Sequence, residues 1–517
     1  MRTLFRISAI AALAMFSVAT TASGSGYPDR GKAIADVSPA SDYGDLVRTR
    51  PRAISIMRAR AQGFVPSAEL HDYVRGVLMR DLAGMKLPAS FQPDIHVLAA
   101  PEFTALCTPD GTVIVTIGLL EQLENEDELA FVLGHEISHA IYRHHDSDWL
   151  TRAQYYAVVN GAAVDSMAKH ASSVIGRSNA ANISRGFNVM EHLYKLSANV
   201  LAPQMTRSQE DQADALGFDL MVHAGYDPEA VLSVMDKLAE QEAEAQRAAE
   251  QAKKAEDADG GGKSVSSMGS ALLGGIGNLA SSGFSVSSLA HNDQLADVAV
   301  TAFDSAVDSM SDQAASHHPA KERADLLSAY AFREYRDLAP ASPKPLPWSP
   351  ASNSPVKLQL TALLSHYAAA EDAAAYVADP NSTTADKAQS ALQRATMPPT
   401  GDHAYTEFVA SEYYDGANKS QLSEVALQKA VKGSEPSWEV YARLIDVYVA
   451  RNDYPHAQAL MTEAVTRFDN SPVLLPKRIA ILHGMGNDAE AEKLLPQCKG
   501  YDIRELDDEC TKAAGKA

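Results

Sequence analysis

The chain has 517 residues, of which 46% are hydrophobic, and it carries a formal net charge of −21 at pH 7. This length exceeds what one hydrophobic core usually supports, so two or more domains are expected. The acidic balance argues against nucleic acid and anionic lipid surfaces as partners. After the first residues, no stretch has the length and hydrophobicity expected of a transmembrane segment.

The N-terminus has the three-part pattern of an export signal. Arg2 and Arg6 precede an apolar run that ends in small residues, which predicts a signal peptide over residues 1–22, cut after Ala22. A membrane anchor is the alternative, but the apolar run is short for a full span. No cysteine stands near the cut, so a lipoprotein anchor is not expected. We therefore expect an exported protein, located in a bacterial periplasm.

The next part of the chain combines a helix with a small sheet. Residues 53–87 repeat apolar side chains at helical spacing, and the period then changes. Strands are predicted at residues 95–98, 103–107 and 112–116, with a Pro-Asp-Gly turn at residues 109–111 before the last strand. We expect the strand at residues 112–116 to form an open sheet edge, where an extended substrate could pair.

A helix is predicted to begin after Asn125, which can cap it together with Glu128 three positions later. The helix contains His135 and His139, which lie four residues apart and therefore share one face, as two imidazoles must to bind one zinc ion. Glu136 beside them is placed to act as a general base. This is the HExxH arrangement of zinc peptidases, which is only moderately specific by itself.

A second helix, expected between Ser208 and Gly225, could supply the third ligand, because catalytic zinc usually takes three protein ligands. Glu210 can bind the metal from this helix. Asp214, four residues later on the same face, can accept the N–H of a ligating imidazole and fix its tautomer. Alone, these two residues would be interpreted as a solvated acidic face; beside HExxH they favour one Zn²⁺ per chain.

The second half of the chain is expected to be helical. A flexible Gly/Ser-rich insert is predicted at about residues 241–313, and residues 342–355 form a proline-rich linker. Residues 356–500 are interpreted as tetratricopeptide-like (TPR-like) repeats, with three weak repeats from about residue 403 to 499, and a generic helical bundle is the alternative. Residues 501–517 form a tail. The positions that agree with a 34-residue period are Tyr414, Ala430, Tyr441, Leu444, Tyr448, Ala457, Ala464 and Ala491.

The chain has three cysteines. Cys498 and Cys510 lie close together in the sequence, and an oxidising compartment would let them form a disulfide, although spacing alone does not prove one. Cys107 is left over and is expected to be a small buried apolar residue.

The stretch from about residue 95 to 238 resembles the zinc metallopeptidase family of the CAAX prenyl endopeptidases and HtpX-type proteases, which are gluzincins. The segments that carry the resemblance read TPDGTVIVTIGLLEQLENEDELAFVLGHEISHAIYRHH and RSQEDQADALGFDLMVHAGYDPEAV. The resemblance implies a mainly α fold with a small β-sheet. A zincin-like peptidase domain, at residues 45–340, would precede the α-helical TPR-like repeat domain. Zn²⁺ would be held by His135, His139 and Glu210, with Glu136 and Asp214 in catalytic roles.

Within this family, the export signal and the C-terminal helices are most similar to the periplasmic beta-barrel assembly-enhancing proteases. This resemblance implies an endopeptidase that cleaves misfolded or misassembled proteins of the outer membrane, with the outer-membrane assembly machinery as a partner of the repeats. The alternative is a chaperone or scaffold that acts through its TPR-like grooves while the peptidase site is largely silent.

Family members often carry a His-Pro pair followed by an arginine after the second metal helix. The segment SHHPAKERADLL supplies His318 and Arg323. The resemblance implies that His318 could approach the zinc, either blocking the position of water or stabilising the transition state. The alternative interpretation makes His318 and Arg323 solvent-exposed loop residues. His144 and His145, which follow the metal-binding helix, are expected to be structural.

Overall fold

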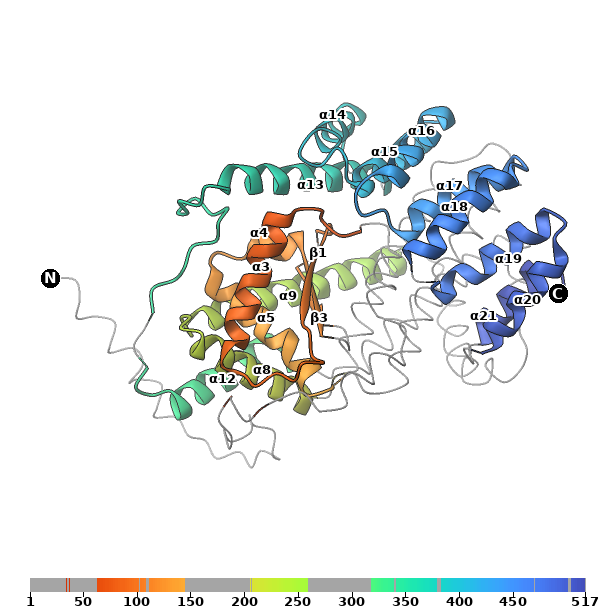
Figure 1. Ribbon diagram of the computed structural model, residues 1–517. Helices are drawn as coiled ribbons and strands as arrows, with labels where there is room; N and C mark the ends of the chain where they lie inside the picture. Colours follow the sequence, from red (N-terminus) through yellow and green to blue (C-terminus); the bar gives the residue numbers. More distant parts are fainter. Residues whose placement is uncertain are drawn as a thin grey trace.

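The computed structural model describes residues 34, 37, 63–101, 103–107, 111–144, 205, 207–258, 318–338, 341–378, 383–468, 470–500 and 504–516. The predicted signal peptide lies outside these residues, as do His145 and the part of the predicted insert that runs from residue 259 to 313. No described helix combines the length and the apolar character that a membrane span needs. The described part of the chain is mostly helical with one small sheet, as expected (Figure 1).

The sheet has three described strands: β1 (Asp94–Leu98), β2 (Ala105–Cys107) and β3 (Thr112–Thr116). Their spatial order is β1-β3-β2, with β1 parallel and β2 antiparallel to β3. The three strands lie where the sequence predicts them, although β2 begins two residues later. Gly111, which ends the predicted turn, has a φ of 81°, a conformation that glycine adopts without strain.

The expectation that residues 112–116 form an open edge is wrong. β3 is the central strand, hydrogen-bonded on both sides, and all five of its residues are buried. A run of consecutive β-branched residues is typical of a strand that is covered on both faces, which agrees with this inner position. Among the described strands, β2 is an edge strand, whereas the outer side of β1 is partly covered by Phe64, which forms a bridge with Leu98.

Helices pack around the sheet to form the first half of the molecule (Figure 1). These helices are α3 (Ala68–Asp81), the 3-10 turn η3 (Leu82–Gly84), α4 (Ile117–Gln122), α5 (Glu126–Ile141), α8 (Arg207–His223), α9 (Ala230–Ala258) and α12 (Ala320–Glu334). Helix α5 contacts α3, α8, α9, β2 and β3, so it lies at the centre of this half. Helix α9 continues to Ala258, so the first part of the predicted flexible insert is helical.

The start of α5 is fixed by a variant of the predicted capping box. The side chain of Asn125 accepts a hydrogen bond from the Glu128 N–H at 2.9 Å, as expected. The Glu128 carboxylate, however, accepts from the N–H of Glu124 at 2.8 Å, one residue before the cap. Both bonds satisfy backbone donors at the point where α5 begins, which fixes the start of the helix that contains HExxH.

Several residues of the proline-rich segment at residues 342–355 are exposed, but hydrogen bonds fasten the segment to the start of α5 and to α4. The Glu126 N–H donates to the Lys344 carbonyl at 2.7 Å, and the Lys344 N–H donates to the buried Asp127 carboxylate at 2.6 Å. The indole of Trp348 donates to the Leu120 carbonyl at 3.2 Å. The segment therefore connects the two halves of the chain while it is held firmly to the first.

The second half consists of helices that pack on their neighbours in the chain. They are α13 (Lys357–Ala378), α14 (Ala385–Ala395), α15 (Ala404–Gly416), α16 (Ser420–Lys432), α17 (Trp438–Ala450), α18 (Tyr454–Arg467), the 3-10 turn η5 (Pro472–Leu474), α19 (Leu475–Gly484), α20 (Asp488–Lys499) and α21 (Arg504–Ala513). Helices α15 and α16, α17 and α18, and α19 and α20 form consecutive pairs (Figure 1).

Helices α15 and α17 begin at Ala404 and Trp438, one 34-residue period apart. Most positions that suggested the repeat are buried between the paired helices, among them Tyr441, Ala457 and Ala464. Paired helices and a buried periodic stripe are what a helical repeat requires. The assignment to TPR repeats stays a prediction.

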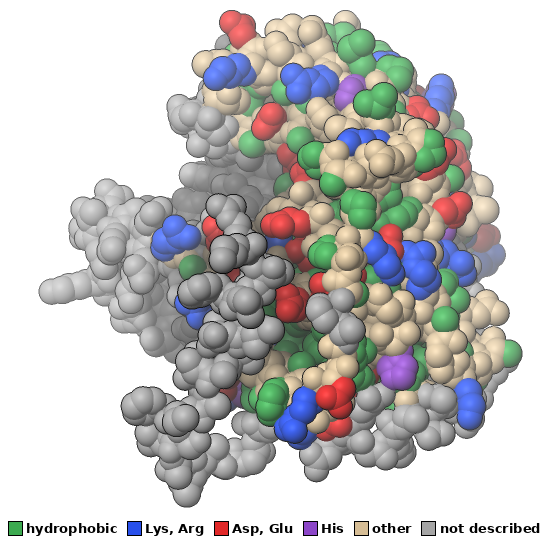
Figure 2. All heavy atoms as spheres, turned by 90° about the vertical axis from the view of Figure 1, so that its left-hand side faces the viewer, with side chains coloured by type: hydrophobic (Ala, Val, Ile, Leu, Met, Phe, Trp, Pro, Cys, Tyr) green, Lys and Arg blue, Asp and Glu red, His purple; other side chains and the backbone are tan. Residues whose placement is uncertain are grey.

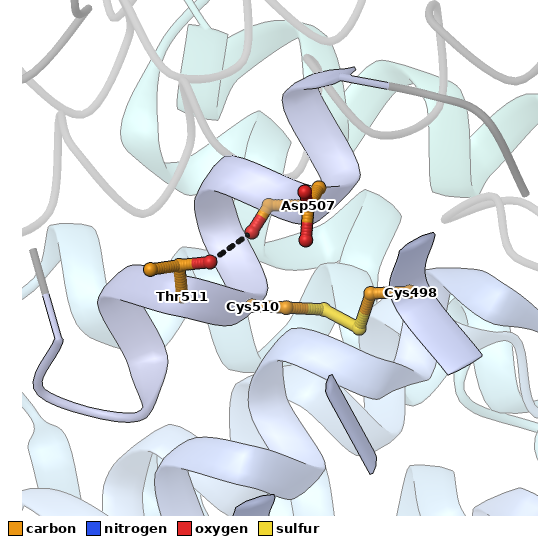
Figure 3. The surroundings of a disulfide bond; sticks show 4 residues. All are labelled: Cys498, Asp507, Cys510 and Thr511. Carbon is orange, nitrogen blue, oxygen red and sulfur yellow. Dashed lines mark hydrogen bonds between the residues drawn. A yellow bond between two sulfur atoms is a disulfide. The ribbon is translucent and has the colours of Figure 1, made fainter. Parts of the chain in front are cut away.

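Near the C-terminus, Cys498 at the end of α20 is joined to Cys510 in α21 by a disulfide. Figure 3 shows this bond and the hydrogen bond that the Thr511 hydroxyl donates to the Asp507 carbonyl one turn earlier, at 2.7 Å. Cys107 at the end of β2 is a free, buried thiol.

The two halves share a hydrophobic cluster. It extends from the sheet and α5 through Leu360 and Tyr367 in α13 to Tyr405 in α15. On the face that Figure 2 shows, the coloured acidic, basic and hydrophobic side chains are interspersed and do not segregate into one basic surface.

Candidate metal centre

Two glycines let α5 and α8 cross closely beside the HExxH motif. A Cβ atom added to Gly217 in α8 would lie 2.7 Å from the backbone nitrogen of His135, and one added to Gly134 in α5 would lie 3.1 Å from the Gly217 carbonyl oxygen. Neither position has room for a larger side chain unless the backbones move apart. The crossing brings the N-terminal turns of α8, which contain Glu210 and Asp214, against the histidines of α5.

The crossing brings together the three side chains predicted to bind a metal. One ligand atom each from His135, His139 and Glu210 can be chosen so that all three lie within 4.8 Å of one another. The two Nε2 atoms are 3.2 Å apart, and the carboxylate oxygens of Glu210 lie 3.6 Å from Nε2 of His135 and 3.7 Å from Nε2 of His139. Ligands of tetrahedral zinc at ~2.0–2.1 Å are separated by roughly 3.3 Å, so this donor set fits the metal.

The three ligand side chains are largely removed from solvent. The exposed fractions are 12% for His135, 6% for His139 and 3% for Glu210. A buried carboxylate beside two imidazole nitrogens needs a positive charge to offset its desolvation. Two histidine nitrogens and one carboxylate oxygen are a typical protein ligand set of catalytic zinc sites, which leave a fourth position to water or substrate.

Asp214 lies behind the first imidazole. Its Oδ1 is 2.8 Å from Nδ1 of His135, and Arg323 from α12 donates two hydrogen bonds to its carboxylate, at 2.9 and 2.6 Å. Burial would raise the pKa of Asp214, but the charge and hydrogen bonds of Arg323 and the contact with His135 outweigh it and hold the pKa far below its usual range. The ionised carboxylate can accept the Nδ1 proton of His135 and leave Nε2 directed at the ligand site.

The second imidazole has a different neighbour. Nδ1 of His139 lies 2.9 Å from Nδ1 of His144, and Nε2 of His144 lies 3.4 Å from the amide oxygen of Gln212 in α8. Burial lowers the pKa of His144 to about 4, which keeps its ring neutral. The sequence predicts only a structural role for His144, because nothing in the spacing indicates that its ring turns back onto His139.

Glu136 follows His135 on α5 and, like His135, is only partly buried, whereas His139 and Glu210 are buried. It is not one of the three grouped ligands. A partly exposed carboxylate that follows a ligand in the sequence remains able to exchange protons with water.

His318 is buried, and Arg323 is a partly buried residue of helix α12, so the interpretation of the two as solvent-exposed loop residues is wrong. His318 has an exposed fraction of 2%; its Nδ1 lies 3.0 Å from Glu322 and its Nε2 lies 3.7 Å from Asp211, the residue after Glu210. It lies beside α8 but does not belong to the group of His135, His139 and Glu210. Arg323 contacts the site indirectly, through Asp214.

Comparison with known proteins places these residues in a family context. The chain is 28% identical over 145 residues to the mitochondrial metalloendopeptidase OMA1 of Arabidopsis thaliana, which is 28% of this chain and 25% of that protein. It is 28% identical over 136 residues to the beta-barrel assembly-enhancing protease of Yersinia pestis, 25% of each protein. It is 31% identical over 140 residues to protease HtpX of Xanthomonas campestris pv. campestris, 25% of this chain and 46% of that protein.

These similarities cover between a quarter and just under half of the length of the relatives, all of which are named as proteases or metalloendopeptidases. The sequence profile of peptidase family M48 matches residues 66–331, which is more than half of the chain and contains both metal-binding helices. The chain therefore belongs to peptidase family M48.

Proposed function

We propose that the protein is a zinc-dependent endopeptidase in which His135, His139 and Glu210 hold one zinc ion per chain. The observation that carries this proposal is the convergence of these three side chains, from two helices, at separations that suit tetrahedral zinc. When bound, the metal supplies Lewis-acid activation of water and of the scissile carbonyl. Membership of family M48 supports the same chemistry.

In this proposal Glu136 is the general base. It takes a proton from the attacking water and returns it to the leaving amine, a role that suits a carboxylate beside the ligands but not among them. Asp214 and Arg323 hold His135 in one tautomer and orientation. Glu136 would thus transfer protons, whereas Asp214 and Arg323 would position His135.

The substrate would be an extended polypeptide. Because β3 is an inner strand of the described sheet, we propose that the substrate pairs at β2, which is an edge strand among the described strands and packs against α5. Backbone hydrogen bonds to an edge strand do not depend on the sequence of the bound peptide. Such binding suits unfolded or misassembled clients, which expose backbone that folded proteins have already paired.

The experiment that tests the activity compares Glu136→Gln with the parental chain and with Glu240→Gln, the same change at an exposed glutamate of α9. Glu136→Gln is expected to retain zinc and to lose cleavage of an unfolded polypeptide by about 10²-fold or more. Glu240→Gln is expected to match the parent in both measurements. Cleavage by Glu136→Gln at the parental rate would rule out Glu136 as the base.

We further propose that the enzyme works in envelope quality control in the periplasm, on misassembled outer-membrane proteins. The N-terminal pattern of an export signal supports this location, and the name of the Yersinia relative supports the client class. The paired helices α15 to α20 would then hold clients or components of the outer-membrane assembly machinery along a TPR-like surface.

A chaperone or scaffold with a largely silent peptidase is the second candidate. The extent of paired helices supports it, because α13 to α21 make up a large share of the described residues. Genetic complementation separates the two functions: Glu136→Gln should fail to restore a deletion strain if proteolysis is the main activity. Full restoration by that variant would favour the scaffold.

A further inference from the structure

The end of α5 turns the chain back on itself in a defined way. The Arg143 N–H donates to the Ala140 carbonyl at 3.1 Å, and the His144 N–H donates to the His139 carbonyl at 2.9 Å. Together with the left-handed φ of 58° at Arg143, these two bonds form a Schellman motif. In this motif the residue after the left-handed one packs against the residue five positions earlier, so the backbone itself brings His144 to His139.

The proton positions in this contact follow from the role of His139. If Nε2 of His139 faces the metal, its ring proton is on Nδ1. That proton points at Nδ1 of His144, 2.9 Å away, which must then act as the acceptor. The proton of the neutral His144 ring is therefore on Nε2, where the amide oxygen of Gln212 can accept it at 3.4 Å. In this hydrogen-bonded series, which runs from His139 through His144 to Gln212, each donor meets an acceptor. Only one tautomer of each imidazole allows both hydrogen bonds.

Helix α8 secures this series at two points. The Gln212 side chain contacts the ring of His144, and the side-chain amide of Gln209 donates to the His144 carbonyl at 3.5 Å. Both glutamines flank Glu210, the ligand that the same helix supplies. His144 therefore links the C-terminal end of α5 to α8 on the His139 side, as Asp214 of α8 contacts α5 on the His135 side.

We propose that His144 is a positioning residue of the metal centre, which fixes the tautomer and orientation of His139 by accepting its Nδ1 proton. This inference rests on the proposed zinc site. Partners of this kind are usually carboxylates, carbonyls or water, and their loss typically weakens metal binding by about 10–100-fold. Here a neutral imidazole takes that place, so the two histidine ligands are oriented by partners of different charge.

The test measures the zinc dissociation constant of the full chain by competition with a coloured chelator, for the parent, His144→Leu and His144→Asn. Leucine keeps apolar bulk but has no acceptor, whereas Oδ1 of asparagine lies near the position of Nδ1. His144→Leu is expected to weaken zinc binding by about 10–100-fold, and His144→Asn by about threefold or less. The absorption bands of bound Co²⁺ should shift in the leucine variant and stay close to the parent in the asparagine variant.

Zinc affinity within threefold of the parent in a folded His144→Leu chain would overturn the proposal. Equal losses in the leucine and asparagine variants would also overturn it, because shape rather than hydrogen bonding would then explain the effect. If His144→Leu does not fold, Gln212→Leu decides: weaker zinc binding is expected, and parental affinity contradicts the series. A parental chain that takes up no zinc would refute the proposed function itself, which is a different result from any of these.

Discussion

Arg323 in α12 donates two hydrogen bonds to the carboxylate of Asp214, which is completely buried, whereas the Arg323 side chain is 12% exposed. Asp214 contacts His135 on its other side, at 2.8 Å. The ion pair therefore connects α12, which lies far along the chain, to the first metal ligand. In the proposed site, this pair would let a residue that does not touch the metal ligands influence the orientation of His135.

Removing the Arg323 guanidinium should lower the stability of the folded chain. Arg323→Met leaves the carboxylate of Asp214 buried without its cation, and the free energy of unfolding is expected to fall by about 3–5 kcal/mol. Chemical denaturation of the zinc-free chain measures this change. A second variant, Arg323→Lys, restores the charge but only part of the paired geometry, so an intermediate loss is expected. A loss below about 1 kcal/mol for Arg323→Met would show that the pair has no structural importance.

Replacing the glycine at the helix crossing should disturb the site. A Cβ at position 217 would lie 2.7 Å from the His135 nitrogen, so Gly217→Ala is expected to separate α5 from α8. The free energy of unfolding should fall by about 1–3 kcal/mol, and zinc binding should weaken. Gly76→Ala in α3 is the control, since the nearest atom to its new Cβ is a flexible arginine end at 3.8 Å. That variant should be unchanged or up to about 1 kcal/mol more stable.

The stability of the chain should depend on pH through His403. This residue is fully buried where Gly63 approaches α15, and burial lowers its pKa to about 3. In the unfolded chain a histidine takes up a proton near pH 6.5, whereas the folded chain excludes it. The contribution of His403 to the free energy of unfolding is therefore fully present above about pH 6.5. It is lost as the pH falls toward 3, at up to about 1.4 kcal/mol per pH unit.

The variant His403→Gln isolates this contribution. Between pH 7 and 5, the free energy of unfolding of the zinc-free parent should fall more steeply than that of the variant. His403 also shares a 2.7 Å hydrogen bond with Tyr367, so the substitution can change the absolute stability at every pH. The comparison therefore uses the difference in slope against pH. Parallel pH profiles for the two chains would exclude His403 as the source.

His318 gives a prediction about regulation. His318→Ala should leave zinc affinity close to the parental value, because His318 is not in the ligand group. Cleavage should rise if the imidazole blocks the site, or fall by about 10²-fold if it stabilises the transition state. Peptide cleavage and zinc content of the same preparation measure both quantities. Cleavage at the parental rate by this variant would show that His318 has no role in catalysis or in its regulation.

Local pattern was sufficient to predict the elements that form the site. The four-residue spacing of His135 and His139, and of Glu210 and Asp214, follows directly from helical geometry, and the structure brings three of these side chains to one point. The strands were predicted because their period and turn residues are local features. Membership of the peptidase family, which the sequence motifs indicated, is confirmed.

The order of the strands could not be predicted in the same way, because it depends on contacts that no local pattern encodes. β3 looks like any short apolar strand, and only its two partners make it central. The role of Gly217 is hidden for the same reason, since its partner Gly134 lies on another helix. The contact between His144 and His139 could not be predicted, because the left-handed residue before His144 is Arg143 rather than the glycine that usually marks such a helix end.

The central claim is that His135, His139 and Glu210 together hold zinc, and the zinc content of purified Glu210→Gln tests it most directly. The parental chain should retain about one zinc ion after gel filtration, and the variant, which lacks the carboxylate ligand from α8, should lose most of it. Glu240→Gln, purified in parallel, should retain the parental amount. A folded Glu210→Gln chain that keeps a full equivalent of zinc would contradict the account.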